Sequence, residues 1–134
     1  MSELTEIDHV AIAVHDLEAA IAYYRDTFGA EVTHREVVER DGVEEALLRV
    51  ADSYIQLLTP VRDDSPVAKS LASRGEGLHH VGYRVADCAA ALARVKAEGH
   101  RVIDEEPRPG SRGTTVAFLH PTSAFGTLIE LVQE

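Results

Sequence analysis

Asp8-His9-Val10-Ala11-Ile12-Ala13-Val14-His15-Asp16 is repeated, at an offset of 71 residues, by His79-His80-Val81-Gly82-Tyr83-Arg84-Val85-Ala86-Asp87. A repeat with a fixed offset indicates duplicated structural units. It also places an imidazole at the same point of each half. The identical pairs that carry the repeat are His9 and His80, Val10 and Val81, Val14 and Val85, and Asp16 and Asp87.

The first half predicts a strand, a helix and three further strands. Asp16 is a helix N-cap residue, apolar side chains follow it at helical spacing, and Gly29 supplies a stop signal. Turn residues separate the later apolar segments. The predicted elements are the strand Ile7–Val14, the helix Leu17–Phe28, and the strands Glu31–Val38, Glu44–Val50 and Tyr54–Thr59.

The second half predicts the same order of elements. A strand over Leu78–Val85 leads through Asp87 into an alanine-rich helix that ends near Gly99. Strands are expected at Arg101–Glu106, Thr115–Leu119 and Thr127–Val132. We therefore expect one α+β domain over residues 1–134, in which two βαβββ modules, residues 7–59 and 78–133, are joined by connector 60–77 with a short helix at 67–73.

Composition excludes several classes of function. The chain has 134 residues, 45% of them hydrophobic, which suits a single globular core and argues against disorder. No apolar run is long enough to span a bilayer and the first residues are acidic, so we expect a cytoplasmic protein without a signal peptide. A formal charge of −10 disfavours nucleic acid and anionic membranes as partners, whereas a local basic cluster could still bind an anionic small molecule.

Two polar residues interrupt otherwise apolar strands at equivalent places in the two halves. Gln56 lies in Tyr54-Ile55-Gln56-Leu57-Leu58, and Glu130 lies in Leu128-Ile129-Glu130-Leu131-Val132. A carboxylate buried among such neighbours needs a cation, a proton or a strong hydrogen-bond partner. The alternative for Glu130 is an exposed place on an edge strand.

His9 and His80, each considered alone, are best explained as ordinary surface or hydrogen-bonded histidines. Together with Gln56 and Glu130 they form a set of nitrogen and oxygen donors that suits an octahedral divalent metal with open positions. Cobalt, manganese, nickel, iron, magnesium and zinc all fit such a set. A closed structural zinc site is disfavoured because the chain has one cysteine, Cys88, and therefore no thiolate pair.

These residues resemble the vicinal oxygen chelate (glyoxalase/bleomycin resistance/dioxygenase) superfamily and, within it, the methylmalonyl-CoA epimerase family. The resemblance covers nearly the whole chain and is specific at Gln56, in the connector Asp63–Leu71 and in Phe118-Leu119-His120-Pro121. It implies that the two βαβββ modules pair into a half-barrel cleft. The implied metal ligands are His9, Gln56, His80 and Glu130.

The resemblance further implies a catalytic base at Glu45, with Glu44 as the rival. Strand alternation does not choose between them, and both could be solvated strand residues. The implied reaction interconverts (2R)- and (2S)-methylmalonyl-CoA through a metal-stabilised enolate, with Glu45 serving one face of the carbon and Glu130 the other. Cobalt is the first choice of metal, and substrate contacts are expected at Lys69, Arg112, Leu119 and His120.

Three other functions are consistent with the same fold. Glyoxalase I shares it but usually has a glutamate at the position of Gln56 and does not need Glu45. A metal-free binding protein of the antibiotic-resistance type would not need all four ligand residues. A dioxygenase would use two histidines and one carboxylate, which Gln56 as a fourth ligand fits poorly. Exposed sheet edges favour a homodimer.

Overall fold

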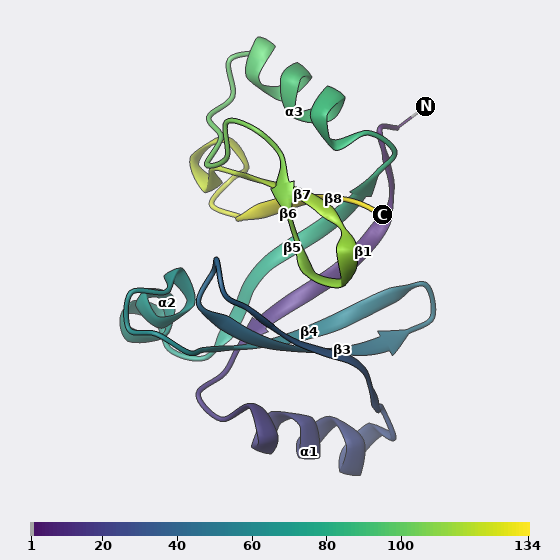
Figure 1. The fold of residues 1–134 in the computed structure, drawn as a ribbon, viewed down its shortest axis with the longest axis vertical. Coiled ribbons are helices and arrows are strands. Elements are labelled where there is room, and N and C mark those ends of the chain that lie inside the picture. Colours follow the sequence, from purple (N-terminus) through teal and green to yellow (C-terminus); the bar gives the residue numbers. More distant parts are fainter. Residues whose placement is uncertain (1) are drawn as a thin grey trace. The chain divides into compact units, whose positions relative to one another are not determined.

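The computed structural model describes residues 2–134 (Figure 1). The chain divides into two compact units. The central unit is Val10–His79, and the terminal unit combines the residues up to His9 with His80–Glu134. Strand β1 (Leu4–Ala13) contributes residues to both. No helix within residues 2–134 has the length and apolarity to cross a membrane.

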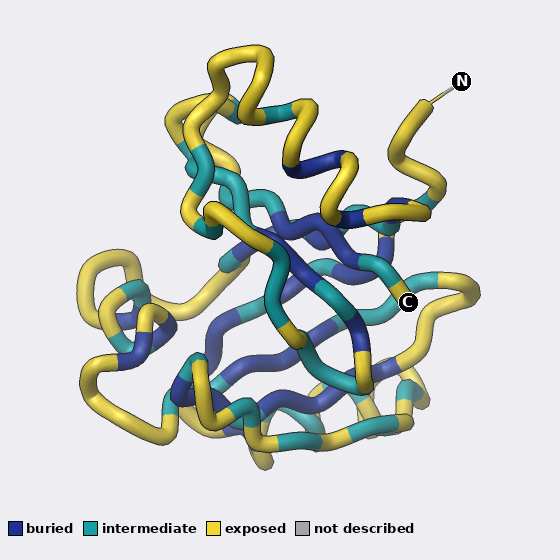
Figure 2. Tube along the Cα trace, turned by 45° about the horizontal axis from the view of Figure 1, so that its top comes forward, coloured by how far each residue is buried: buried dark blue, intermediate teal, exposed yellow. Residues whose placement is uncertain are grey.

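The central unit is built on an antiparallel sheet. Its middle strand β3 (Val43–Val50) pairs with β2 (Val32–Val38) and with β4 (Ser53–Pro60). Helix α1 (Leu17–Phe28) covers one face of β3 and β4 (Figure 1). Its Leu17 joins a buried apolar cluster with both strands. Buried and exposed segments of the chain are distinguished by colour in Figure 2. Helix α2 (Pro66–Arg74) packs against β4.

Local signals in the sequence set the ends of these helices. The Asp16 side chain accepts a hydrogen bond from Ala19 N at 3.1 Å, and Gly29 adopts a left-handed conformation with φ of 70° that ends α1. Ser65 caps α2 in the same way and Pro66 occupies its first turn. The helix predicted at Leu17–Phe28 is confirmed at both bounds.

The terminal unit combines parallel and antiparallel pairing. Most of β5 (Gly77–Val85) lies in it and pairs in parallel with β8 (Ile129–Gln133), which pairs antiparallel with β7 (Thr115–Leu119). A two-residue strand, β6 (Arg108–Pro109), adds to β7. Helix α3 (Cys88–Ala97) closes a core in which Cys88 and Leu92 are buried.

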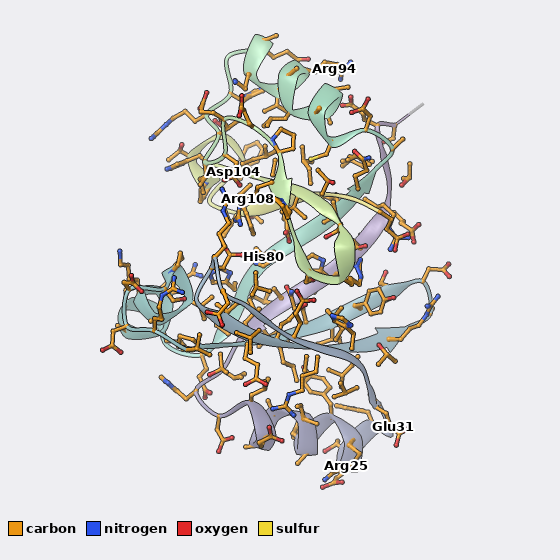
Figure 3. The ribbon with its side chains drawn as sticks, in the orientation of Figure 1. Arg25, Glu31, His80, Arg94, Asp104 and Arg108 are labelled. Carbon is orange, nitrogen blue, oxygen red and sulfur yellow. The ribbon has the colours of Figure 1, made fainter. Side chains whose placement is uncertain are left out.

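The predicted strand Arg101–Glu106 is wrong. The segment makes a single bridge, Val102 to Leu119, after which Ile103 N and Asp104 N both donate to Phe118 O. The Asp104 carboxylate accepts from Phe118 N at 2.8 Å, so a side chain replaces the next backbone partner. Arg108 Nε donates a hydrogen bond to Asp104 Oδ1 at 3.1 Å (Figure 3). Arg108 is also the first residue of β6, directly after Pro107. Hydrogen bonds to the Asp104 side chain therefore replace the backbone pairing that the predicted strand would have made.

Candidate functional site

Three predicted metal ligands converge within the terminal unit. His9 lies on β1, His80 on β5 and Glu130 on β8, and all three are buried. Their donor atoms form a triangle, with 3.0 Å between His9 Nε2 and His80 Nε2, 2.9 Å between His9 Nε2 and Glu130 Oε1, and 3.0 Å between His80 Nε2 and Glu130 Oε1. One atom of each side chain therefore faces a common point.

The triangle fits a divalent cation. Metal–ligand bonds of about 2.1 Å at right angles place neighbouring donors about 3.0 Å apart, which is the spacing seen here. Two imidazole nitrogens that face each other repel unless a proton or a cation lies between them. The donor set of two nitrogens and one carboxylate oxygen suits a transition metal with open positions.

The electrostatics of the triangle favour positive charge. Burial alone would lower the pKa of His9, but hydrogen bonds with Asp8 and Glu130 raise that pKa above its usual range. Burial alone would raise the pKa of Glu130, but hydrogen bonds with His80 and His9 lower it below its usual range. The carboxylates that stabilise an imidazolium proton here would also stabilise a bound metal ion.

Neighbouring groups hold both imidazoles in place. His9 Nδ1 lies 2.7 Å from Asp8 Oδ2, and its ring lies against the backbone of Gly82. The ring of His80 (Figure 3) meets Phe118 edge-on, with 5.1 Å between centroids. Phe118 is the cross-strand neighbour of Glu130, which places both of these side chains on one face of the β7–β8 pair.

Gln56 and Glu45 meet within the central unit. Both are buried, and Gln56 Nε2 donates a hydrogen bond to Glu45 Oε2. Glu44, in contrast, is half-buried and forms an ion pair with Arg35 at 2.9 Å. Of the two rivals, only Glu45 is buried beside a predicted metal ligand. The roles of Glu45 as base and Gln56 as ligand stay predictions.

A histidine and a second carboxylate lie near Glu45 in the same unit. His34 Nε2 lies 2.8 Å from Glu36 Oε1, and one donor atom from each of His34, Glu36 and Glu45 lies within 4.8 Å of the others. Glu36 is also the cross-strand partner of Glu45. The sequence could have indicated this cluster through its alternation, since His34 and Glu36 share one face of β2.

The predicted substrate contacts occupy different environments. Lys69 is exposed, whereas Arg112 is turned inward and its Nη2 binds Asp8 Oδ1 at 2.8 Å. His120 accepts a hydrogen bond from Thr122 N at 3.1 Å through Nδ1. Leu119 is the cross-strand partner of Ile129 and so lies on the opposite face of the β7–β8 pair from Glu130. These four substrate contacts stay predictions.

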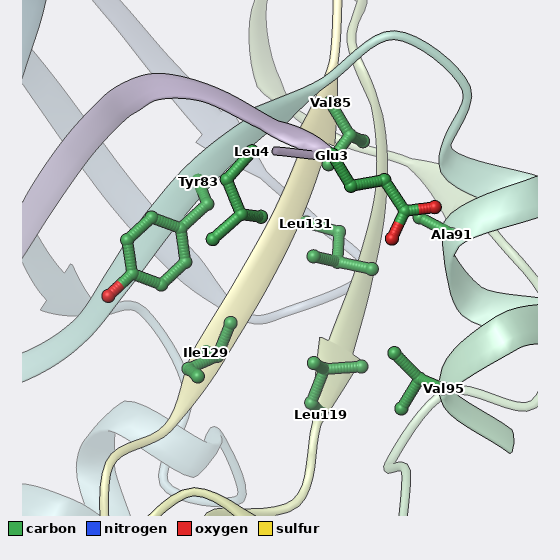
Figure 4. Close-up of a pocket in the computed structure, with 9 residues that line it drawn as sticks. All are labelled: Glu3, Leu4, Tyr83, Val85, Ala91, Val95, Leu119, Ile129 and Leu131. Atoms are coloured by element: carbon green, nitrogen blue, oxygen red, sulfur yellow. The ribbon is translucent and has the colours of Figure 1, made fainter. Parts of the chain in front are cut away.

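An apolar cavity lies under α3 on that opposite face (Figure 4). Leu119, Ile129 and Leu131 line it from the sheet, and Val95 lines it from the helix. Because side chains alternate along β8, this cavity and the metal triangle are on different sides of the strand.

Sequence reasoning missed Asp8 and Arg84 as parts of the site. Asp8 is 1% exposed and directly precedes His9, and Arg84 Nη2 binds it at 2.6 Å. Burial would raise the pKa of Asp8, but hydrogen bonds from His9, Arg112 and Arg84 hold it well below its usual range. The sequence did offer one signal for this pair: Asp8 and Arg84 are each the one acidic or basic residue, histidines aside, of an otherwise mostly apolar predicted strand.

Comparison with known proteins gives a consistent result. The family model of the glyoxalase/bleomycin resistance protein/dioxygenase superfamily matches residues 8–118. The ethylmalonyl-CoA/methylmalonyl-CoA epimerase of Cereibacter sphaeroides is 43% identical over 129 residues, which are 95% of this chain and 96% of the relative.

Solved structures of methylmalonyl-CoA epimerases superimpose on nearly the whole chain. A methylmalonyl-CoA epimerase in complex with methylmalonyl-CoA and NH4+ superimposes with a TM-score of 0.95 at 49% identity, covering 98% of this chain and 95% of the other. The methylmalonyl-CoA epimerase of Mycobacterium tuberculosis superimposes with a TM-score of 0.95 at 40% identity, covering 99% of this chain and 90% of the other. The α+β fold predicted from the repeat is confirmed.

Proposed function

The chain belongs to the glyoxalase/bleomycin resistance protein/dioxygenase superfamily, and we propose that it is a metal-dependent epimerase of methylmalonyl-CoA. The observation that carries the proposal is the buried His9–His80–Glu130 triangle in a chain that is 49% identical to an epimerase solved with methylmalonyl-CoA. The relative from Cereibacter sphaeroides, which is named for ethylmalonyl-CoA as well, supports a branched malonyl thioester as the substrate class.

The residues that would hold the metal are His9, His80 and Glu130, with Gln56 as the proposed fourth ligand. A bound divalent cation supplies Lewis-acid stabilisation of the negative charge that develops on the thioester oxygen when the α-proton leaves. Cobalt is our first choice, and manganese, nickel, iron, magnesium and zinc suit the same donors.

The chain itself must move the proton. Inversion requires removal of the proton from one face of the carbon and delivery to the other, which a single fixed carboxylate cannot easily do and two carboxylates can. Glu45 is fully buried and accepts a hydrogen bond from Gln56, which fixes one carboxylate oxygen, and we propose it as the base on one face. Glu130 is proposed to serve the opposite face.

The remaining assignments follow from the chemistry of an acyl-CoA. Its phosphates call for basic groups, for which Lys69 and Arg112 are proposed, with Leu119 and His120 as further substrate contacts.

We propose a cytoplasmic homodimer that acts in propionate metabolism, without nucleic acid or membrane partners.

The test is deuterium exchange. The Co²⁺-loaded protein is incubated with one epimer of methylmalonyl-CoA in deuterated water, and loss of the α-proton signal is followed by NMR. We expect conversion to the other epimer with deuterium at the α-carbon. Absence of exchange, together with conversion of methylglyoxal and glutathione, would replace the proposal by a glyoxalase I activity.

The proposed base is tested by two neighbouring variants. Glu45→Gln should lower turnover by about 10²-fold or more, which is typical of a lost general base, and should keep the metal content of the parent protein. Glu44→Gln is the matched control, because Glu44 pairs with Arg35 instead of Gln56, and should retain nearly full turnover. Full turnover in Glu45→Gln would make the assignment wrong.

A further inference from the structure

A buried carboxylate stands directly behind the candidate ligand His9. Asp8 is 1% exposed, and its Oδ2 lies 2.7 Å from His9 Nδ1, the ring nitrogen that faces away from the metal triangle. His9 Nε2, on the other side of the ring, faces His80 and Glu130 at 3.0 and 2.9 Å. The order along this line is Asp8, His9 and then the common point of the triangle.

Two arginines hold the Asp8 carboxylate from the other side. Arg84 on β5 reaches Asp8 Oδ1 through Nε at 3.1 Å and Nη2 at 2.6 Å. Arg112 reaches Oδ1 at 2.8 Å and Oδ2 at 3.0 Å. Arg112 lies in the short 3-10 turn Ser111–Gly113 and has a φ of 43°, so a strained backbone is retained where its side chain meets Asp8.

We propose that Asp8 is a positioning residue for the metal centre, which holds the proton on His9 Nδ1 and so presents Nε2 to the cation. A carboxylate that accepts from the outer nitrogen of a ligand histidine fixes its tautomer and ring orientation and makes the inner nitrogen a stronger donor. The inference rests on the proposed metal centre, but it is independent of the reaction.

The repeat places a carboxylate directly before His9 but a histidine directly before His80. The residue equivalent to Asp8 in the second half is His79, which carries no negative charge to offer to His80. His80 is instead packed against the ring of Phe118. The duplicated scaffold therefore supplies the preceding carboxylate to one of the two proposed ligand histidines, His9.

The role of Asp8 predicts opposite changes in metal affinity for loss of its negative charge and for loss of a neighbouring positive charge. If Asp8 acts on the metal through charge, its loss weakens metal binding. Loss of a positive charge behind it, as in Arg112→Met, leaves the affinity unchanged or tightens it. If Asp8 only stabilised the local fold, removal of either partner of the Asp8–Arg112 pair would weaken metal binding alike.

The first experiment measures the Co²⁺ dissociation constant by competition with a chelator. Asp8→Asn should raise it by about 10- to 100-fold, as found for lost outer-shell partners. Arg112→Met should stay within twofold of the parent or bind more tightly. Asp87→Asn, which removes a charge in the same unit but keeps an N-cap, is the matched control and should bind like the parent.

A second measurement needs only the parent protein and a ligand variant. In the Zn²⁺-loaded, ¹⁵N-histidine-labelled protein, His9 should show a protonated Nδ1 with a downfield proton resonance, assigned by its loss in His9→Gln. A His9 ring without a proton on Nδ1 overturns the inference whether or not Asp8→Asn folds.

The outcomes separate the two proposals. Parent-like Co²⁺ affinity in Asp8→Asn, or equal weakening in Asp8→Asn and Arg112→Met, overturns the role of Asp8 and leaves the epimerase proposal intact. Failure of the parent protein to bind Co²⁺ overturns both. Normal metal affinities with the expected signs but no α-proton exchange support the role of Asp8 and reject the epimerase.

Discussion

The backbone of Gly82 lies close to the ring of a candidate metal ligand, His9. A Cβ atom added at Gly82 would lie 2.3 Å from His9 Cε1, 2.6 Å from Nδ1 and 2.8 Å from Nε2. Such distances are far below van der Waals contact, so the His9 ring occupies the space that any side chain at this position would need. The glycine is therefore required by the packing of His9, since its backbone φ is not in the left-handed region.

We expect Gly82→Ala to displace His9 and damage the metal centre. The variant should bind Co²⁺ at least tenfold more weakly and lose about 1–3 kcal/mol of unfolding free energy, the usual cost of overpacking. Chelator competition and urea denaturation measure the two effects. Gly99→Ala is the control: its Cβ meets no atom within 4 Å, so it carries only the strain of a positive φ and should keep the parent's Co²⁺ affinity. Equal affinities in both variants would contradict the argument.

The repeat made the proposed ligand histidines visible in the sequence, but not the residues that hydrogen-bond to them. His9, His80 and Glu130 were predicted because each has a counterpart in the other half, and the structure brings all three together. Asp8 and Arg112 are 104 positions apart and have no shared motif, so only the folded backbone reveals their ion pair.

Helices α1 and α3 begin with the same cap in the two halves. Asp16 accepts from Ala19 N at 3.1 Å and Asp87 accepts from Ala90 N at 3.0 Å. Each satisfies one backbone donor that the first turn would otherwise leave without a partner. The duplication thus preserved the start of the helix, which connects the first strand of each half to the rest of its module.

We expect both caps to contribute similarly to stability. Asp16→Ala and Asp87→Ala should each lower the unfolding free energy by about 1 kcal/mol, the usual cost of losing a side-chain cap. Asp16→Asn and Asp87→Asn keep the acceptor and should stay within about 0.5 kcal/mol of the parent. Urea denaturation in the presence of EDTA measures all four without a contribution from metal. A loss in the asparagine variants as large as in the alanine variants would assign the effect to charge.

Elements with a local signal were predictable, and those formed by distant partners were not. The caps and spacing predicted α1 at its observed bounds, and Thr115–Leu119 is a strand as expected. Arg101–Glu106 failed because its strand pattern competes with Asp104, whose carboxylate takes the backbone N–H of Phe118. The partner of this carboxylate, Phe118, lies 14 positions from Asp104 in the sequence, so periodicity alone could not reveal the interaction.

At the scale of the whole chain, the charge and the buried triangle both favour cations. The formal charge of −10 attracts any divalent ion weakly and without a fixed site. The triangle of His9, His80 and Glu130 is proposed to bind one ion at a defined place, and all three side chains are buried. Because those ligands come from three strands of the terminal unit, a bound ion would stabilise the folded state of that unit over the unfolded chain, where the ligands are far apart in sequence.

Metal binding should therefore raise the thermal midpoint of unfolding. The size of this increase should distinguish an ion bound at the triangle from ions attracted to the charged surface. At a free Co²⁺ concentration about 100 times the dissociation constant, the expected gain is about 2.7 kcal/mol, and EDTA should reverse it. His80→Ala should be less stable than the parent in EDTA, because it leaves a cavity beside Phe118, and should gain almost nothing from Co²⁺. Calorimetry at low and high salt completes the test: surface attraction is screened by salt, whereas ligation by buried donors persists. Equal Co²⁺ stabilisation of parent and His80→Ala would locate the ion elsewhere on this acidic chain.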